Sequence, residues 1–495
     1  MFITIRGSVF VDFLLFIERT KLMKKFVIMI MTCAFLTSIF LATGYCQFDA
    51  RKRAKEAPLK NNKNAEVVKE TLDSDLDPAA SSLRVRYSYP VPRVNRVALE
   101  DKVYDEISLN NVQNFAEPGQ PLLPLDGHYI LIPQGKKVVD ISVKTDDAKS
   151  LGTGFIVRPE SEPVFVSDDR GKPLPIPNED IYSSNEMFPG EIAKKVSSSW
   201  FRGYQILALN IAPVQFIPSS GEVLYYRDIT IHVTLALDRD PVHPLFRGSK
   251  TDRLEIRRRV ENPSVADTYL DKVRNVSETA YDMVIITGAD LVNGLVPLKN
   301  MHDSTGVSTH IVTVEDIYQN YPGVDNPEKI RNFIISAYND WQVDYVLLAG
   351  DAGIIPARLL RPSQSGDATV VSDQYYSCLD GPYNADGDQY WGEIHDGENG
   401  EDIDFFAEVY IGRATIENSQ EVQNFVNKTI AYVNLDPNSD YLKKVSLMGE
   451  HIGEDYWGGD ALDRLIDGAF YNNKITVGLP SHELDIETLY DENWP

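Results

Sequence analysis

The sequence is poor in cysteine, with only three residues in a chain of 495. Cys33 and Cys46 lie in or beside an apolar N-terminal stretch, so Cys378 stands alone in the body of the protein. A lone cysteine excludes an intramolecular disulfide framework. Stability must therefore come from hydrophobic cores and, where acidic side chains gather, from a bound metal ion.

Positive charge is scarce as well. The chain has 48 Lys and Arg against 73 Asp and Glu, which gives a formal net charge of −25. Binding to a polyanion depends on clustered Lys and Arg that release counterions. We therefore expect no nucleic-acid partner, whereas the excess of acid is compatible with a secreted, calcium-binding protein.

The N-terminal apolar core is shorter than the roughly 20 residues that a bilayer-spanning helix needs. This core, residues 26–41, follows lysines at 24–25 and precedes the small residues 42–44. That order is typical of a secretory signal. We predict a signal region over 1–44, cleaved after Gly44, and a secreted or cell-surface location.

Two alternatives remain open for this end of the chain. Residues 1–22 add a second apolar patch, which favours either a true start at Met23 or a membrane anchor. Cys46 lies where a lipoprotein would carry its lipid. Tyr45, at the place where lipoprotein signals have a small residue, argues against lipid attachment.

Aromatic side chains are absent from residues 49–82, which are polar and charged. So little apolar surface does not offset the entropy of ordering, and we predict a disordered linker over 45–82. Beyond it, residues 83–240 show short alternating apolar runs separated by turn signals such as PQG at 133–135. This pattern, without helical periodicity, predicts an antiparallel β-sandwich or barrel.

Residues 241–278 carry few strand signals and contain a basic cluster, Arg257-Arg258-Arg259, in an otherwise acidic chain. We predict a linker with a proteolytic processing site near this cluster. The alternative is a solvated helix face, because residues 252–259 could form one or two helical turns.

From residue 279 to residue 495 the sequence alternates between strand and helix periods. The predicted strands are 282–287, 309–314, 345–349, 409–411 and 445–448. A cap, a proline and an acid at 326–328 (NPE) predict a helix start. An apolar stripe at helical spacing follows, formed by Ile330, Phe333, Ile334, Ala337 and Trp341. Repeated β–α units predict an α/β domain with a mainly parallel, doubly wound sheet.

Two stretches carry most of the functional signal: DYVLLAGDAGIIPAR (344–358) and EVYIGR (408–413). The run 345–349 is continuously apolar, which is typical of a strand buried on both faces. Gly350-Asp351 then places a carboxylate at the carboxyl end of that strand, where open α/β sheets keep their sites. The pattern therefore indicates an enzyme.

Both stretches resemble the gingipain-like cysteine peptidases. Phrases in the predicted β domain are similar to the prodomain of the same family: EPGQP at 117–121, FRG at 201–203 and PVQF at 213–216. The resemblance extends from about residue 85 to the end of the chain and is most specific within 281–460.

The resemblance implies a secreted cysteine endopeptidase precursor. Its β prodomain would act as an intramolecular inhibitor of a caspase-like α/β catalytic domain that cleaves protein and peptide substrates. In such enzymes a Cys thiolate attacks the peptide carbonyl, a His acts as acid and base, and backbone N–H groups stabilise the oxyanion.

The His and Cys of the family lie further along its sequence than Pro495. We therefore expect the catalytic dyad beyond the given chain, and no activity from residues 1–495 alone. A non-catalytic extracellular binding or adhesive protein, which keeps the fold without the dyad, is the alternative.

Residues 380–404 form a loop dense in carboxylates. Against a twelve-position EF-hand loop, Asn384, Asp386 and Glu393 fall at the third, fifth and twelfth places. Pro382 occupies the first place, which requires an acid, so the loop is not an EF-hand. Several oxygen ligands in one loop nonetheless repel one another unless a cation lies among them, and the resembling family uses structural calcium.

Ca²⁺ is therefore the predicted ion, and a solvated acidic loop is the alternative. The candidate ligands are Asp380, Asn384, Asp386, Asp388 and Glu393. Three further carboxylates at strand ends form a second candidate set, although each can equally cap a helix or turn. They are Asp351, Asp373 and Glu408.

Glu450 follows the predicted strand 445–448, and Asp460 opens the next predicted helix. The resemblance implies that Glu450 lies near the catalytic His and that Asp460 lies in the pocket for the residue before the cleaved bond. A carboxylate at the base of such a pocket prefers an Arg or Lys guest, because a guanidinium engages both oxygens. A plain helix cap is the alternative for Asp460.

Cys378 is not predicted to be the nucleophile. A reactive thiolate needs a base and a positive setting, whereas the acidic loop follows this residue directly. His395 and His451 have no recognisable partner and are predicted to be surface histidines.

Overall fold

In the computed structural model the described residues are 65–66, 81–99, 102–161, 174–239, 242–270, 280–361, 369–393, 406–436, 438–449 and 485–490. Lys60–Glu160 and Ile176–Val433 form one compact unit; Met1–Leu59, Ser161–Pro175 and Asn434–Pro495 belong to a second. The predicted signal region lies outside the described residues, as does nearly all of the predicted linker. Within the described part, no helix has the length and apolar character to cross a membrane.

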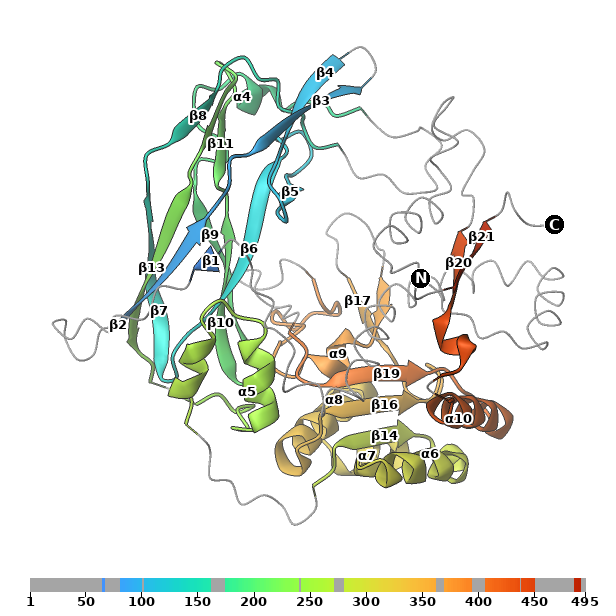
Figure 1. The fold of residues 1–495 in the computed structure, drawn as a ribbon. Helices are drawn as coiled ribbons and strands as arrows, with labels where there is room; N and C mark the ends of the chain where they lie inside the picture. Colours follow the sequence, from blue (N-terminus) through green and yellow to red (C-terminus); the bar gives the residue numbers. More distant parts are fainter. Residues whose placement is uncertain are drawn as a thin grey trace. The chain divides into compact units, whose positions relative to one another are not determined.

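The N-terminal part of the compact unit is built of antiparallel sheets (Figure 1). One sheet has the order β1-β2-β13-β7. Its strands are Ala65–Glu66, Ser81–Ser88, Asp228–Leu237 and Lys136–Thr145. Val85 and Ile231 face each other in register and are buried, whereas Arg84, the strand neighbour of Val85, is exposed. This alternation is the period of two that the sequence predicts.

Two further sheets share the core of the first. The sheet β5-β6-β10-β9 consists of Gln113–Phe115, Leu123–Leu131, Tyr204–Ile211 and Ala193–Phe201, and the sheet β11-β12-β8 of Val214–Ile217, Glu222–Tyr225 and Lys149–Gly152. A ribbon of β3 (Arg93–Leu99) and β4 (Lys102–Ser108) and the short helix α4 (Glu179–Tyr182) complete the elements before β13. We call residues 81–237 the β domain.

Residues 222–235 are one alternating apolar run in the sequence but belong to two strands in the structure. β12 pairs with β11 and β8, whereas β13 pairs with β2 and β7. The chain therefore passes from one sheet to another at Tyr226 and Arg227. Periodicity alone does not show this break, because both strands keep the same alternation.

The hairpin between β9 and β10 turns at Arg202 and Gly203, whose φ angles are 51° and 76°. A Cβ on Gly203 would lie 2.4 Å from the Cα of Phe246, so this approach requires glycine. The Arg202 side chain is 1% exposed. The FRG phrase is thus a tight turn packed against the chain at Phe246.

Residues 241–278, expected to be a linker, contain the helix α5 (Lys250–Arg257) and the short helix η1 (Pro263–Thr268). Ser249 caps α5, because its hydroxyl accepts a hydrogen bond from the Asp252 N–H at 3.0 Å. Ile256 and Val265 are fully buried in the core of the β domain. The linker interpretation therefore does not hold for these residues, and α5 overlaps the one or two helical turns that the sequence allows over 252–259.

The second part of the compact unit is a fully parallel sheet of order β15-β14-β16-β19. Its strands are Thr309–Thr313, Met283–Thr287, Tyr345–Ala349 and Tyr410–Ala414. Its helices are η2 (Ala289–Leu291), α6 (Val292–Ser304), α7 (Val314–Asn320), α8 (Asn326–Ser336), η3 (Ala337–Trp341) and α10 (Ser419–Val433).

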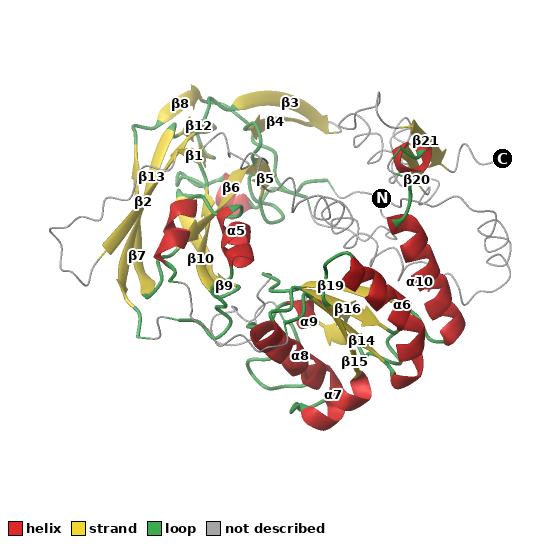
Figure 2. Ribbon diagram, turned by 60° about the horizontal axis from the view of Figure 1, so that its bottom comes forward, coloured by secondary structure: helices red, strands yellow, loops and turns green. Residues whose placement is uncertain are grey.

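Helices cover both faces of this sheet (Figure 2). Ile285 packs with residues of α6 and α10, whereas its neighbours Val284 and Ile286 pack with α7 and α8. The parallel, doubly wound arrangement that the sequence predicts is therefore present in the described residues, and the strand at 345–349 has the predicted bounds.

Helix α8 begins at the predicted place, but its cap is Asp325, whose carboxylate accepts a hydrogen bond from the Glu328 N–H at 3.0 Å. The predicted stripe is core: Ile330 and Phe333 are 0% and 1% exposed. Asn418 caps α10, because its Oδ1 accepts hydrogen bonds from the N–H groups of Gln420 and Glu421, at 3.1 Å each.

A ribbon of β17 (Arg358–Leu360) and β18 (Val370–Ser372) and the helix α9 (Gln374–Ser377) connect β16 to β19. In the second unit, η4 (Asp440–Lys443) precedes β20 (Lys444–Gly449), which pairs in parallel with β21 (Asp485–Tyr490). The predicted strand at 445–448 is therefore present. Glu450 and Asp460 lie outside the described residues.

Candidate functional site

The two informative stretches meet at the carboxyl edge of the parallel sheet. Arg413, at the end of EVYIGR, donates through Nη1 to the carbonyl oxygens of Gly350 and Ile355, at 2.9 and 2.8 Å. Its Nε and Nη2 donate to the carboxylate of Asp373, at 2.8 and 2.7 Å. A bidentate pair of this kind is geometrically specific. Arg413 therefore fixes the loop that follows β16.

Asp351 lies within that loop. Its Oδ1 accepts hydrogen bonds from the N–H groups of Gly353 and Ile354, at 3.0 and 3.1 Å. A hydrogen bond and charge repulsion from Asp351 raise the pKa of the exposed Glu417, which follows the neighbouring strand β19. The edge thus carries a pair of carboxyl groups, one of which holds a proton more readily than a free glutamate.

The structure does not bring the predicted set of Asp351, Asp373 and Glu408 together. Asp351 follows a strand, whereas Glu408 precedes β19 and so belongs to the opposite, amino edge. Glu408 is fully buried, and its Oε2 accepts from the Leu379 N–H at 2.8 Å. Its Oε1 accepts from the backbone N–H of Arg202 in the β domain at 3.2 Å. Glu408 therefore holds two segments together.

The base of the acidic loop is held by arginines and aromatic rings. Arg331 donates to the carbonyl oxygens of Cys378 and Gly381, at 2.8 and 2.7 Å. Its guanidinium carbon also lies 5.0 Å from the Tyr375 ring centroid and 5.5 Å from that of Tyr383. Cations over aromatic faces attract the ring electrons. This part of the loop is ordered by the protein's own side chains.

Arg358, the last residue of the first stretch, acts in the same way. Its guanidinium donates to both carboxylate oxygens of Asp325, at 2.7 and 2.9 Å, and lies 3.7 Å from the Trp391 ring centroid. The Gly392 N–H donates to the Tyr383 carbonyl at 2.7 Å and closes the loop. Residues 380–393, the described part of this loop, are therefore held in place by contacts within the protein.

Residues 384–393, which we call the loop tip, gather three of the five predicted calcium ligands. Carboxylate oxygens of Asp386, Asp388 and Glu393 lie within 4.8 Å of one another. The Asn384 side chain donates its N–H to the Asp388 carbonyl at 2.9 Å, so the amide braces the tip. Three carboxylates suit a hard divalent cation. Arg361 reaches Glu393 at 3.6 Å and competes for it.

Asp380, the fifth predicted ligand, lies with a different group. Its carboxylate, that of Glu408 and the Cys378 sulfur lie within 4.8 Å of one another. Cys378 is fully buried, and its Sγ is 3.8 Å from Asp380 Oδ1. Two carboxylates beside a buried sulfur disfavour a thiolate. His395 and His451 lie outside the described residues.

A buried charge network joins the β domain to the parallel sheet. Arg247 donates through Nη2 to Asp252 and to Asp344, at 2.6 Å each, and through Nη1 to the Val343 carbonyl at 3.1 Å. Arg202 donates to Asp252 at 2.8 Å. Burial raises the pKa of Asp252, but the two guanidinium groups outweigh this effect and hold the pKa below its usual range. We call these four charged residues the junction network.

The β domain has a second buried charge cluster. His128 contacts Asp126 through Nε2 at 2.9 Å and Glu261 through Nδ1 at 3.0 Å. Burial lowers the pKa of His128, but the hydrogen bonds to the two carboxylates outweigh this effect and raise the pKa to about 8. The histidine therefore carries a proton at neutral pH and joins β6 to the segment after α5.

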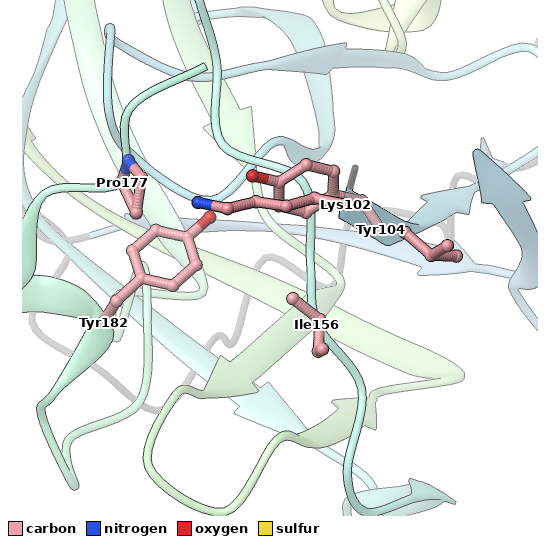
Figure 3. Close-up of a pocket in the computed structure, with 6 residues that line it drawn as sticks. Lys102, Tyr104, Ile156, Pro177 and Tyr182 are labelled. Atoms are coloured by element: carbon pink, nitrogen blue, oxygen red, sulfur yellow. The ribbon is translucent and has the colours of Figure 1, made fainter. Parts of the chain in front are cut away.

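The β domain also contains an apolar pocket of about 440 Å³ (Figure 3). In this view Tyr182 and Pro177 lie across the cavity from Lys102 and Tyr104. The Tyr182 hydroxyl donates to the Val157 carbonyl at 2.9 Å, so it is already satisfied. The pocket is lined by β-domain residues alone and contributes no group to the carboxyl edge.

Comparison with known protein families accounts for both halves of this arrangement. Residues 61–246 match the propeptide of peptidase family C25, and residues 276–494 match the peptidase itself. The chain belongs to peptidase family C25. This confirms the gingipain-like resemblance of the two stretches and of the prodomain phrases.

Curated relatives of the chain are gingipains of Porphyromonas gingivalis. Gingipain R1 is 23% identical over 330 residues, 64% of this chain and 29% of the relative. Lys-gingipain W83 is 23% identical over 419 residues, which are 82% of this chain and 21% of the relative. Gingipain R2 is 24% identical over 335 residues, which are 64% of this chain and 39% of the relative. The chain thus spans well under half the length of these relatives.

Two solved structures are partly similar to the chain. The complex of the RgpB pro- and mature domains has a TM-score of 0.29 at 17% identity, and covers 37% of this chain and 88% of that one. The Arg-specific cysteine proteinase gingipain R has a TM-score of 0.29 at 21% identity, with coverages of 44% and 43%. Assignment to the family rests on the sequence matches.

Sequence reasoning missed the arginines of the site. Arg413 and Arg202 stand in phrases that it singled out, but their partners lie 40 and 50 residues away at Asp373 and Asp252. Arg247 falls in the predicted linker. The sequence does show these arginines as cations in an otherwise acidic chain. Which carboxylate each arginine pairs with is decided by tertiary contacts.

Proposed function

We propose that the chain is the precursor part of a secreted cysteine endopeptidase of the gingipain type, with its Cys/His dyad encoded beyond residue 495. The observation that carries this proposal is the succession of a propeptide match and a peptidase match along one chain. The carboxyl edge ordered by Arg413 supports it, because parallel α/β sheets keep their sites at that edge.

The β domain would act as the intramolecular inhibitor. Its Arg202 reaches both a carboxylate of α5 and, at 3.6 Å, Asp344 at the start of β16. Contact between the two parts through buried, paired charges is specific, because removing one partner leaves an unpaired charge in the interior. In the full-length protein, Asp344→Ala should therefore raise the basal peptidase activity.

Specificity for Arg or Lys before the cleaved bond would come from Asp460. Relatives named gingipain R and Lys-gingipain support a basic residue there. The test uses the full-length protein, extended by its own coding sequence, on peptides that differ only in Arg, Lys or Leu before the bond. We expect cleavage after Arg or Lys alone, and loss of this preference in Asp460→Ala.

Two outcomes would overturn parts of this proposal. Equal cleavage of all three peptides by both forms would remove the pocket role of Asp460. Absence of cleavage, together with a coding sequence that contains no further His and Cys, would favour a non-catalytic binding protein instead.

Replacing Glu450 by Gln should lower kcat with little change in KM if this acid supports the catalytic His.

Calcium binding at the loop tip would stabilise the precursor without taking part in the chemistry. The close approach of Asp386, Asp388 and Glu393 supports this role. Mutual repulsion among three carboxylates falls when a divalent cation lies among them. A calorimetric titration of the chain with Ca²⁺, and with Mg²⁺ as comparison, tests it; no heat with either ion would reject the site.

A further inference from the structure

The chain after α5 continues into the β domain. Asn262 receives a hydrogen bond from the Leu131 N–H at 2.7 Å and returns one to the Leu131 carbonyl at 2.8 Å. The preceding Glu261 N–H donates to the Tyr129 carbonyl at 2.9 Å. Because Tyr129 and Leu131 belong to β6, the segment occupies backbone groups of this strand. We call Glu261–Tyr269 the anchor segment.

Tyr269 ends the anchor segment inside the β-domain core. It is 2% exposed. Its hydroxyl donates to the Ile132 carbonyl at 2.7 Å and accepts from the Gln205 N–H at 3.0 Å. Its ring centroid lies 4.5 Å from that of Tyr204 and 5.6 Å from that of Phe246. Buried aromatic residues with a satisfied polar end contribute strongly to association.

The arginine cluster 257–259 lies just before the anchor segment and is part of the same fold. Arg257 pairs with Asp267 at 2.5 Å. Arg258 and Arg259 reach Glu255 at 3.3 and 3.5 Å. The Arg259 guanidinium also lies 4.8 Å from the Phe201 ring centroid. Each pair is exposed and individually weak, but together they keep all three arginines in the folded surface.

We infer that the β domain extends to Tyr269, beyond the end of its propeptide match at residue 246, and that cutting the chain at 257–259 leaves both products bound through the anchor segment. The peptidase part would then keep an N-terminal tail inserted in the β-domain core. Only a cut after Leu270 would leave this tail with the β domain and weaken the association.

This inference deepens the proposed function, because it states how the inhibitor and the peptidase part separate. Its physical basis does not need catalysis. A segment that inserts Val265, Ala266 and Tyr269 into a core adds buried apolar area to whatever holds the two parts together. The segment also adds a second contact between the same two parts, which raises the effective concentration at which the partners of the junction network meet.

The test compares two positions for the recognition sequence of an added site-specific protease. One full-length form carries it between Arg258 and Arg259, and the other carries it directly after Leu270. After cleavage, both are followed by size-exclusion chromatography over a dilution series, in urea below the onset of unfolding of the uncut protein. We expect the form cut at the cluster to dissociate at least about 100-fold less readily.

Substitutions in the form cut at the cluster identify the anchor. Tyr269→Ala should raise the dissociation constant more than about tenfold, and Tyr269→Phe, which loses only the hydroxyl, by less. Leu270→Ala is the matched control, because Leu270 is 75% exposed. Equal dissociation of the two cut forms, or equal effects of Tyr269→Ala and Leu270→Ala, would overturn the inference.

Hydrogen exchange on the unmodified chain gives a test without insertions. The Val265 N–H donates to Asn262 and the Tyr269 N–H to Ala266, within the anchor segment. We expect these amides to be protected to the same degree as those of β6. Exchange at the rate of an unstructured peptide would contradict the assignment even if the inserted forms fail to fold. Because none of these measurements needs peptidase activity, an inactive protein does not affect them.

Discussion

Two groups of carboxylates in this chain lie in opposite environments. In the junction network, Asp252 is fully buried and receives hydrogen bonds from two guanidinium groups. At the loop tip, Asp386 and Asp388 are exposed, and no Lys or Arg of the described part pairs with either. Burial thus demands a partner within the protein, whereas exposure leaves room for an ion from solution.

The largest effect is expected from breaking the buried group. Asp252→Asn should lower the free energy of unfolding by about 3–5 kcal/mol, because two buried guanidinium groups lose their countercharge. Urea denaturation measures this loss. Lys299→Met, which removes one partner of the surface pair Lys299–Asp303, is the control and should cost below about 1 kcal/mol. A loss for Asp252→Asn no larger than that of the control would contradict this account of the network.

The exposed group should respond to the ion. Ca²⁺ at about 100 times its dissociation constant should stabilise the folded chain by about 2.7 kcal/mol. Thermal unfolding with and without Ca²⁺ measures this, and the double variant Asp386→Asn, Asp388→Asn should show no shift. Asp380→Asn should keep the shift, since Asp380 lies with Cys378 and Glu408. Loss of the shift in Asp380→Asn, with the shift kept in the double variant, would place the ion near Asp380 instead.

His128 places a buried cation between two carboxylates and makes stability depend on pH. Its pKa of about 8 exceeds the unfolded value of 6.5, so its contribution is complete below pH 6.5 and is lost as the pH rises through 8. The shift corresponds to about 2 kcal/mol. Tyr87 and Tyr89 stay neutral in this window, because burial and Asp126 or Glu261 raise their pKa.

The measurement is the free energy of unfolding between pH 6 and pH 9. The unmodified chain should lose about 2 kcal/mol over this range. His128→Gln should lose little, because no proton is exchanged at this position. A decline of equal size in both forms would assign the pH dependence to other groups.

The smallest effect is expected at the carboxyl edge of the parallel sheet, where variants of Asp351 and Glu417 should differ in stability. Asp351→Ala should cost about 1 kcal/mol, because the carboxylate accepts hydrogen bonds from two N–H groups of its turn and alanine has no acceptor to replace it. Glu417→Gln should leave the melting temperature unchanged, since this side chain is exposed. Equal shifts for the two variants would mean that Asp351 does not order the loop.

The sequence predicted the parallel sheet well and the connections poorly. Strand 345–349 and the stripe of α8 are local patterns of apolar residues, and both are found where predicted. The helices between 250 and 268 are too short to show a clear period, so the sequence favours a linker there and offers helical turns over 252–259 only as the alternative. Three carboxylates of the acidic loop, which are near one another in the sequence, also lie within 4.8 Å of one another in space, whereas Asp380 lies with Cys378 and Glu408.

The sequence by itself determined the family, the order of β domain and α/β domain, and the chemical types available to the site, because motifs and periods are properties of neighbouring residues. Only the tertiary structure decided which charges neutralise each other. Arg202 meets Asp344 across 142 positions and His128 meets Glu261 across 133. Coulomb energy depends on distance in space and on burial, and neither follows from separation along the chain.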